Sequence, residues 1–286
     1  MRWESILLGL VLSSLMGALG YWRRALDAGG VAGAVLVGTL IFGLGGWIWG
    51  LLLITFFVSS SWLSRYRRAD KQEIGEKFAK GSRRDLGQAL ANGGVGALLA
   101  VVFAWYPEPV LFAGFLGVMA TVNADTWATE LGVLSPDLPR LVTTGQAVSP
   151  GTSGGITSLG TWASLAGALL VGAVAALLIQ IDSLVNGAGS ASGLYAPLRA
   201  HAVTYPLLAV AGGLGGSFLD SLMGATVQGI YYCTGCAKET ESPLHRCGRP
   251  AQPIRGWSWL NNDLVNLLAS IGGGLLAASL AWIVWR

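Results

Sequence analysis

The residues best suited to chemistry are four carboxylates set in otherwise apolar stretches. They are Asp125, Glu130, Asp220 and Asp263. Ionisable side chains inside such stretches are costly and by default mark a pathway or a site. Carboxylates with neighbouring amides are the hard oxygen ligands that Mg²⁺ prefers, typically together with substrate phosphates. These residue types therefore predict a magnesium site that acts on phosphates, with the four acids as catalytic residues.

Polar and small residues form four clusters at helical spacing, three of which contain these acids. The clusters are Asp85, Gln88, Asn92 and Gly96; Asn123, Asp125, Thr126, Thr129 and Glu130; Ser217, Asp220, Ser221, Gly224 and Gln228; and Asn262, Asp263, Asn266 and Ser270. In a regular helix, Asp125 and Thr129 point away from the rest of their cluster. Either that helix breaks, or two neighbouring elements share its polar groups. A single cluster fits polar contacts between helices as well as it fits a site, whereas four together favour a site.

Cationic residues and a glycine-rich segment could bind the phosphates. Lys80, Arg83 and Arg84 lie next to the first cluster and carry positive charge for phosphate oxygens. The segment 149–156 includes Gly151, Thr152, Ser153, Gly154 and Gly155. Backbone N–H groups before a helix N-terminus can bind an anion, although an ordinary capped turn has the same composition. The segment lacks the lysine of a Walker A loop, and the chain has no GxGxxG fingerprint, so a soluble nucleotide-binding fold is not indicated.

The three cysteines of the chain lie in one short stretch that also contains a histidine. Cys233, Cys236, His245 and Cys247 offer the ligand set of a Cys₃His structural zinc site. Unligated cysteines are the alternative. A redox CxxC is less well supported, because no thioredoxin-like βαβ pattern surrounds it. We therefore expect a structural Zn²⁺ in a cytoplasmic loop at 232–258.

Membrane-spanning helices must position these residues. Of the 286 residues, 53% are hydrophobic and 12% are charged, compared with roughly one-quarter charged residues in soluble domains. Apolar stretches near the ~20 residues needed to cross a bilayer predict an all-α, polytopic helical bundle of eight spans in one domain, 1–286. The spans are 4–22, 30–46, 47–64, 86–106, 108–129, 156–181, 203–231 and 260–285. The second and third meet at Gly45 and Gly46 with almost no loop. The seventh is too long unless it tilts or breaks near 212–216.

The distribution of basic residues predicts the orientation. The connection 65–84 carries eight Lys and Arg residues, so the positive-inside rule makes it cytoplasmic. This topology places 15 of the 18 Lys and Arg residues inside and both termini outside. The polar clusters then lie near the cytoplasmic face of what we expect to be the cytoplasmic membrane. The net charge of +3 is too small to indicate nucleic-acid binding.

Five segments, in order along the chain, carry a family resemblance. They are GSRRDLGQALANGGVGALLA (81–100), NADTWATELGVLS (123–135), VSPGTSGGITSLGT (148–161), GSFLDSLMGATVQ (216–228) and NNDLVN (261–266). They resemble the membrane protein family of transmembrane protein 19, which also includes the phytyl-phosphate kinases of plants and cyanobacteria. The resemblance implies an all-helical membrane enzyme that phosphorylates a prenyl monophosphate with a nucleoside triphosphate.

Carried over by motif, the resemblance implies particular site residues. They are Asp85, Gln88 and Asn92; Asn123, Asp125, Thr126 and Glu130; Gly151, Thr152, Ser153, Gly154 and Gly155; Asp220 and Ser221; and Asn262, Asp263 and Asn266. The plant kinases do not clearly show the cysteine-rich loop, so the loop gives no support for phytol as the substrate.

Three functions are consistent with these residues. The first is a Mg²⁺-dependent kinase acting on a prenyl monophosphate or another lipid phosphate in the bilayer. The second is nucleotidyl transfer to a lipid phosphate, and the third is a transporter or lipid-binding protein without chemistry. We assign the acids to Mg²⁺ first, because an attacking phosphate oxygen is already ionised and needs no strong base.

Overall fold

The computed structural model describes residues 3–71, 83–186 and 194–286. Within these ranges, eight helical segments are long and apolar enough to cross a membrane, as the sequence predicts. They are α1 (Trp3–Trp22); α2 (Ala28–Leu40) continued by the π-helical turn η1 (Ile41–Gly45); α3 (Trp47–Arg65); α5 (Leu86–Trp105); α6 (Pro109–Gly132); α7 (Ser158–Asn186); the 3₁₀ turn η3 (Ala202–Thr204) continued by α9 (Tyr205–Thr226); and α10 (Asn262–Val284). The protein is therefore a polytopic helical membrane protein.

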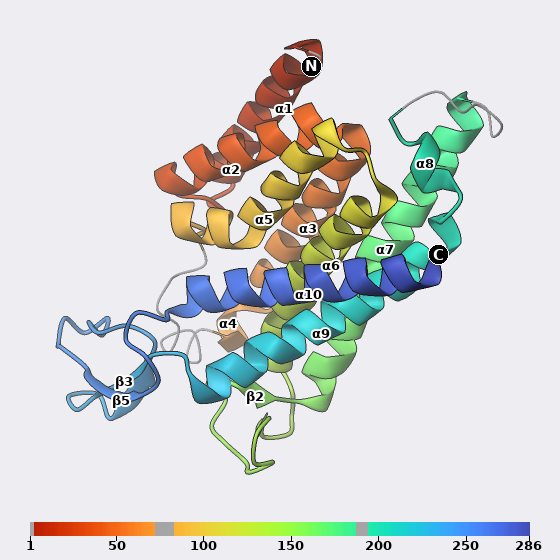
Figure 1. Ribbon diagram of the computed structural model, residues 1–286. Helices are drawn as coiled ribbons and strands as arrows, with labels where there is room; N and C mark the ends of the chain where they lie inside the picture. Colours follow the sequence, from red (N-terminus) through yellow and green to blue (C-terminus); the bar gives the residue numbers. More distant parts are fainter. Residues whose placement is uncertain (1–2, 72–82, 187–193) are drawn as a thin grey trace.

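The central helix of the bundle is α6 (Figure 1). It packs against α3, α5, α7, α9 and α10, and every residue from 112 to 124 is buried. Trp49 of α3 stacks on Phe115 of α6 with ring centroids 4.1 Å apart. Because α6 is enclosed by neighbouring helices, its polar side chains meet protein groups rather than lipid.

Glycines bring α6, α9 and α10 into close contact. A Cβ atom on Gly212 of α9 would lie 2.7 Å from the carbonyl oxygen of Gly273 and 2.9 Å from the Cα of Gly117. Thr121 Oγ1 donates a hydrogen bond to the Gly212 carbonyl at 3.0 Å. Small residues allow membrane helices to approach this closely. This packing keeps α9 continuous through 212–216, where the sequence left a break open.

A turn at Gly46 joins the second and third spans with almost no loop, as expected. Gly46 has φ +85°, a left-handed conformation that favours glycine. The hydroxyl of Tyr195 accepts a hydrogen bond from Ile48 N at 3.2 Å and donates one to Gly45 O at 3.1 Å. A side chain from the distant α7–α9 connection thus supplies the hydrogen bonds that a longer loop would otherwise make.

Two predicted span ends were wrong by about one turn. The sixth span continues to Asn186 rather than 181. Asp182 is only 4% exposed, and it can be buried there because its Oδ2 forms an ion pair with Arg199 Nη2 at 2.9 Å. The seventh ends at Thr226 rather than 231, because the chain turns into a strand from Ile230. Gln228, expected on the helical stripe of the seventh span, therefore lies beyond the end of α9.

Short elements connect the spans. They are α4 (Arg68–Lys71), α8 (Ala196–Arg199), the antiparallel pair β1 (Arg140–Leu141) and β2 (Gly155–Ile156), and β3 (Ile230–Cys233), β4 (Lys238–Thr240) and β5 (Gln252–Arg255), which form a sheet in the order β4-β3-β5. The sequence did not predict these strands. Figure 1 shows α4 and the strands at one end of the bundle and both termini toward the other. We call the end with α4 and the strands the basic side.

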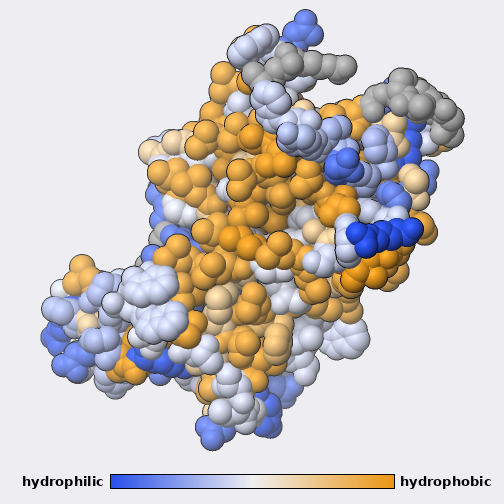
Figure 2. Space-filling model, viewed as in Figure 1, coloured by the Kyte–Doolittle hydropathy of each residue, from blue (hydrophilic) through white to orange (hydrophobic). Residues whose placement is uncertain are grey.

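The surface agrees with a membrane location. Figure 2 shows a broad hydrophobic face over the helices, with hydrophilic side chains at the basic side and also toward the opposite end. Exposed leucines, valines and tryptophans are frequent on the spans, for example on α1 and α10. In a bilayer these side chains contact lipid, so their exposure needs no partner protein.

Candidate functional site

A cavity of about 530 Å³ lies at the basic side of the bundle. Its walls come from α3, α5, α6, α7, α9, α10, the segment 150–157 and Glu241. The expected site residues that line it are Arg84, Gln88, Asn92, Asp125, Thr126, Glu130, Gly151, Thr152, Ser153, Gly154, Gly155, Asp220, Ser221, Asn262 and Asn266. Members of all four polar clusters and of the glycine-rich segment thus meet around one space.

The α6 cluster reaches this cavity without a break in the helix. Asp125, Thr126, Thr129 and Glu130 all line the cavity, while Asn123 faces the interior. Asn123 Oδ1 accepts a hydrogen bond from Ser59 Oγ at 2.9 Å, and its Nδ2 donates to Gly167 O at 2.8 Å. Neighbouring elements therefore share the polar groups of α6, and Asn123 joins α3, α6 and α7 rather than lining the cavity.

Three carboxylates in the cavity wall interact electrostatically. Asp125 on α6 interacts with Glu241, and Asp220 on α9 interacts with both. One oxygen of Asp220, Oδ2, is buried with no hydrogen-bond partner in the described part of the chain. Like charges repel, so a bound cation would stabilise the ionised forms of these carboxylates. Glu241 was not predicted as a site residue, because it belongs to the cysteine-rich loop and has no helical polar pattern around it.

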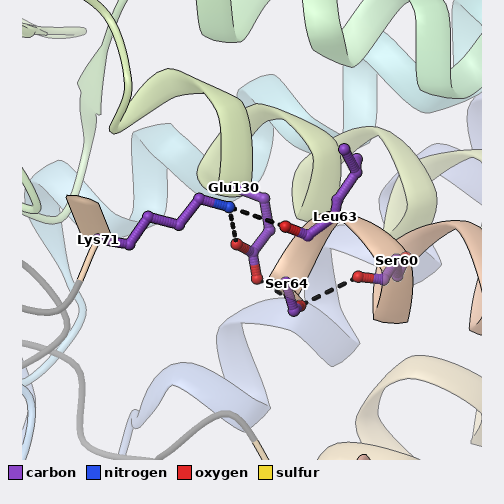
Figure 3. Close-up of polar contacts among 5 residues, drawn as sticks. All are labelled: Ser60, Leu63, Ser64, Lys71 and Glu130. Carbon is purple, nitrogen blue, oxygen red and sulfur yellow. Dashed lines mark hydrogen bonds and ion pairs between the residues drawn. The ribbon is translucent and has the colours of Figure 1, made fainter. Parts of the chain in front are cut away.

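Glu130 is held by a cation and a hydroxyl group (Figure 3). Lys71 Nζ lies 2.7 Å from Glu130 Oε2 and donates to Leu63 O at 2.8 Å, while Ser64 Oγ donates to Glu130 Oε1. The ion pair already compensates the charge of this carboxylate. Lys71 lies in the basic connection 65–84, and nothing in the local sequence pattern links it to α6.

Among the described Lys and Arg residues, Arg84 is the one that lines the cavity, and it lies in the α3–α5 connection. Its Nη1 donates to Ser61 Oγ at 3.2 Å, and its guanidinium lies over Phe56 and Phe57 at 5.2 and 5.6 Å from the ring centroids. Burial lowers the pKa of Arg84 to about 10, partly opposed by the negative charge of Glu130. Arg84 is therefore cationic at neutral pH, yet poorly hydrated and suited to an anionic ligand.

Other residues expected in the site lie outside the cavity lining. Asp85 caps α5 by accepting a hydrogen bond from Gln88 N at 2.9 Å. Arg83 is exposed, and Asp263 lies in the first turn of α10 without lining the cavity. Lys80 lies outside the described residues. These residues were expected in the site because each lies near a helix end. The rotation of each helix, however, decides which side chains enter the cavity.

The glycine-rich segment forms one wall, although not as a loop leading directly into a helix. It first forms β2, and α7 begins at Ser158 with Thr157 Oγ1 accepting a hydrogen bond from Gly160 N at 3.0 Å. Gly154 has φ +82°, and a Cβ atom there would lie 2.5 Å from Ala225 N of α9. The glycine therefore permits both the turn and the close approach of this wall to α9.

A second, mostly apolar pocket adjoins the polar cavity. Side chains of α1, α2, α3 and α5, such as Val37 and Phe56, line it. Arg84, Gln88 and Asn92 line both this pocket and the polar cavity. This pocket is small, about 80 Å³, and joins the polar cavity at these three side chains.

The cysteine-rich loop assembles the cluster that its spacing predicts. One ligand atom from each of Cys233, Cys236, His245 and Cys247 lies within 4.8 Å of the others. Hydrogen bonding to the His245 side chain lowers the pKa of the Cys247 thiol to about 6. Among the described residues, this is the one group of three or more His, Cys, Asp or Glu side chains whose ligand atoms lie close enough together to hold a metal ion. A magnesium ion in the polar cavity would need ligands from its substrates.

Fold and site define a polytopic membrane protein with a polar, acidic cavity at one end and a cysteine–histidine cluster beside it. The chain belongs to the DUF92 family of integral membrane proteins, whose model matches residues 11–274. The match confirms the family membership that the five sequence segments indicated.

Relatives from plants and archaea match over most of the chain. Protein PGR of Arabidopsis thaliana is 34% identical over 279 residues, which cover 92% of each chain. The uncharacterized membrane protein MJ0933 of Methanocaldococcus jannaschii is 30% identical, over 88% of this chain and 84% of its own. The chloroplastic protein VTE6 of Arabidopsis thaliana is 24% identical, over 96% of this chain and 71% of its own. No solved structure matches the chain.

Proposed function

We propose that this protein is a membrane-embedded phosphotransferase that converts a prenyl monophosphate to the diphosphate with a nucleoside triphosphate and Mg²⁺. The observation that carries the proposal is the junction of an acidic, polar cavity with an apolar pocket at Arg84, Gln88 and Asn92. The resemblance to a family that includes phytyl-phosphate kinases supports the same reaction. The charge distribution along the chain supports a cytoplasmic active face.

Asp125 and Asp220 are the carboxylates best placed for the metal. They project from the packed helices α6 and α9 into a cavity with room for phosphates, and Mg²⁺ is usually bound by one or two carboxylates together with substrate oxygens. The bound ion would neutralise charge on the transferred phosphoryl group. Glu130 is a weaker candidate than the sequence indicated, because Lys71 already compensates its charge.

The remaining groups of the cavity bind and orient the substrates. Arg84 binds the phosphate of the lipid, whose tail extends past the apolar pocket into the bilayer, and the glycine-rich segment faces the phosphates of the nucleotide. An ionised oxygen of the lipid phosphate attacks the γ-phosphorus. The bond from the γ-phosphorus to the bridging oxygen breaks, and the nucleoside diphosphate leaves with that electron pair. The attacking oxygen carries no proton, so no side chain need act as a strong base.

Purified protein incubated with prenyl monophosphates, labelled nucleotides and Mg²⁺ is expected to form lipid diphosphate and nucleoside diphosphate. Asp125→Asn and Asp220→Asn should each lower kcat by about 100-fold or more, the scale seen when a group that stabilises transition-state charge is lost. Glu108→Gln is the matched control, because Glu108 is an exposed carboxylate at the opposite end of α6.

The products separate the alternatives. Release of pyrophosphate with a nucleotide joined to the lipid would assign nucleotidyl transfer to the same site. Lipid uptake in proteoliposomes without nucleotide turnover would assign transport. Folded protein that forms no diphosphate from any donor and acceptor pair would exclude the kinase.

A further inference from the structure

The cysteine–histidine cluster has the dimensions of a tetrahedral metal site. The Sγ atoms of Cys233 and Cys247 lie 3.7 Å apart. This is too long for a disulfide bond of about 2.05 Å and close to the ~3.8 Å edge of a tetrahedron with Zn–S bonds of ~2.3 Å. His245 is 6% exposed, and its Nε2 is buried without a hydrogen-bond partner among the described residues. A metal bound by this ring would offset the cost of burying it.

The sheet that carries these residues is too small to be stable by its strand pairing alone. β3, β4 and β5 contain four, three and four residues, and so short a sheet needs a core or a staple. Cys233 ends β3 and Cys236 lies in the β3–β4 turn, whereas His245 and Cys247 lie between β4 and β5. One ion would therefore tie together both connections of the sheet.

The same sheet contacts the wall of the polar cavity through two charged side chains. Glu241, directly after β4, accepts hydrogen bonds from Ser153 Oγ at 2.9 Å and Gln228 Nε2 at 3.1 Å. Arg255, at the end of β5, donates to Gly224 O at 3.0 Å and Ser153 O at 3.4 Å. Residues at the ends of both outer strands thus hold the glycine-rich segment at Ser153.

We propose that Cys233, Cys236, His245 and Cys247 bind one zinc ion, and that this ion holds the sheet so that it fixes Ser153 in the cavity wall. Four protein ligands leave no open position for a substrate, so the zinc is structural. Its loss frees the sheet and loosens the glycine-rich segment, while the spans keep their own contacts. Zinc binding stands independently, whereas any effect on turnover rests on the proposed function.

Metal analysis tests the zinc site. Protein purified without chelator should contain about one zinc per chain, and the double variant Cys233→Ser, Cys236→Ser should lose it. Thr234→Ala is the matched control, because Thr234 is exposed between the two ligands and its loss should leave the zinc in place. Absence of zinc from the wild-type protein, or its retention by the double variant, overturns the proposal.

Hydrogen exchange tests the coupling without requiring activity. In the double variant, amides of 149–156 and 238–255 should exchange faster than in the zinc-bound protein, while those of α6 stay unchanged and show that the bundle is folded. Glu241→Ala should keep zinc yet speed exchange in 149–156. Unchanged exchange there after zinc loss overturns the coupling. Faster exchange in a protein without kinase activity would leave the coupling intact and contradict the proposed function instead.

Discussion

Two acidic side chains near the end of α6 have different surroundings. Glu130 is bound by Lys71 and Ser64, whereas Asp125 interacts with another carboxylate, Glu241. A paired carboxylate holds the α4 segment against the bundle, and a carboxylate among like charges attracts a cation. At the scale of the residue, the partner of an acid rather than the acid itself separates a structural role from the proposed metal-binding one.

Arg84 yields a prediction at the residue scale. Replacing it with glutamine should raise KM for the lipid phosphate roughly 10- to 100-fold, the equivalent of about 1.5–3 kcal/mol for a charge-assisted hydrogen bond. Arg84→Lys should recover only part of the loss, because an ammonium lacks the guanidinium fork. Steady-state kinetics with varied lipid phosphate measure both effects.

The neighbouring arginine provides the control for this prediction. Arg83 is exposed and does not line the cavity, so Arg83→Gln should leave KM for the lipid phosphate near its wild-type value. Equal losses in the two variants would show that general positive charge near the membrane surface, rather than the position of Arg84, governs binding.

The crossing of α6, α9 and α10 yields a prediction at the scale of elements. Gly212→Ala places a Cβ atom 2.7 Å from the Gly273 carbonyl oxygen, and such overpacking should lower the free energy of unfolding by about 1–3 kcal/mol. Denaturation in detergent, followed by helical circular dichroism, measures the change. Gly94→Ala on α5 is the control, because a Cβ atom there meets no atom within 4 Å. A similar loss of stability in both variants would contradict the packing argument.

The observed helix boundaries agree with the predicted ones where hydropathy alone decides them. The eight spans and the tight turn at Gly46 were predicted, because apolar length and glycine placement are local properties. The ends of α7 and α9 were not predicted. The end of α7 depends on the pairing of Asp182 with Arg199, and that of α9 on the chain joining a sheet. Both contacts involve residues beyond the helix itself.

The orientation of the whole molecule yields the remaining prediction. Because the basic side carries the cavity, the positive-inside rule predicts that the cavity faces the cytoplasm and that both termini lie outside. A C-terminal alkaline phosphatase fusion, which requires export, should be active, and a C-terminal green fluorescent protein fusion, which requires the cytoplasm, should be dark. The reverse pattern would place the cavity outside, away from cytoplasmic nucleotides, and would contradict the proposed kinase.

Sequence patterns alone predicted the spans, the grouping of polar clusters at one end and the cysteine–histidine ligand set, because length, hydropathy and spacing are properties of the local sequence. The packed helices were needed to show that Asn123 and Asp85 serve packing and capping, that Lys71 compensates Glu130 and that Glu241 joins Asp125 and Asp220 in the cavity wall. These assignments depend on helix rotation and on contacts between segments distant in sequence, and no local pattern records either.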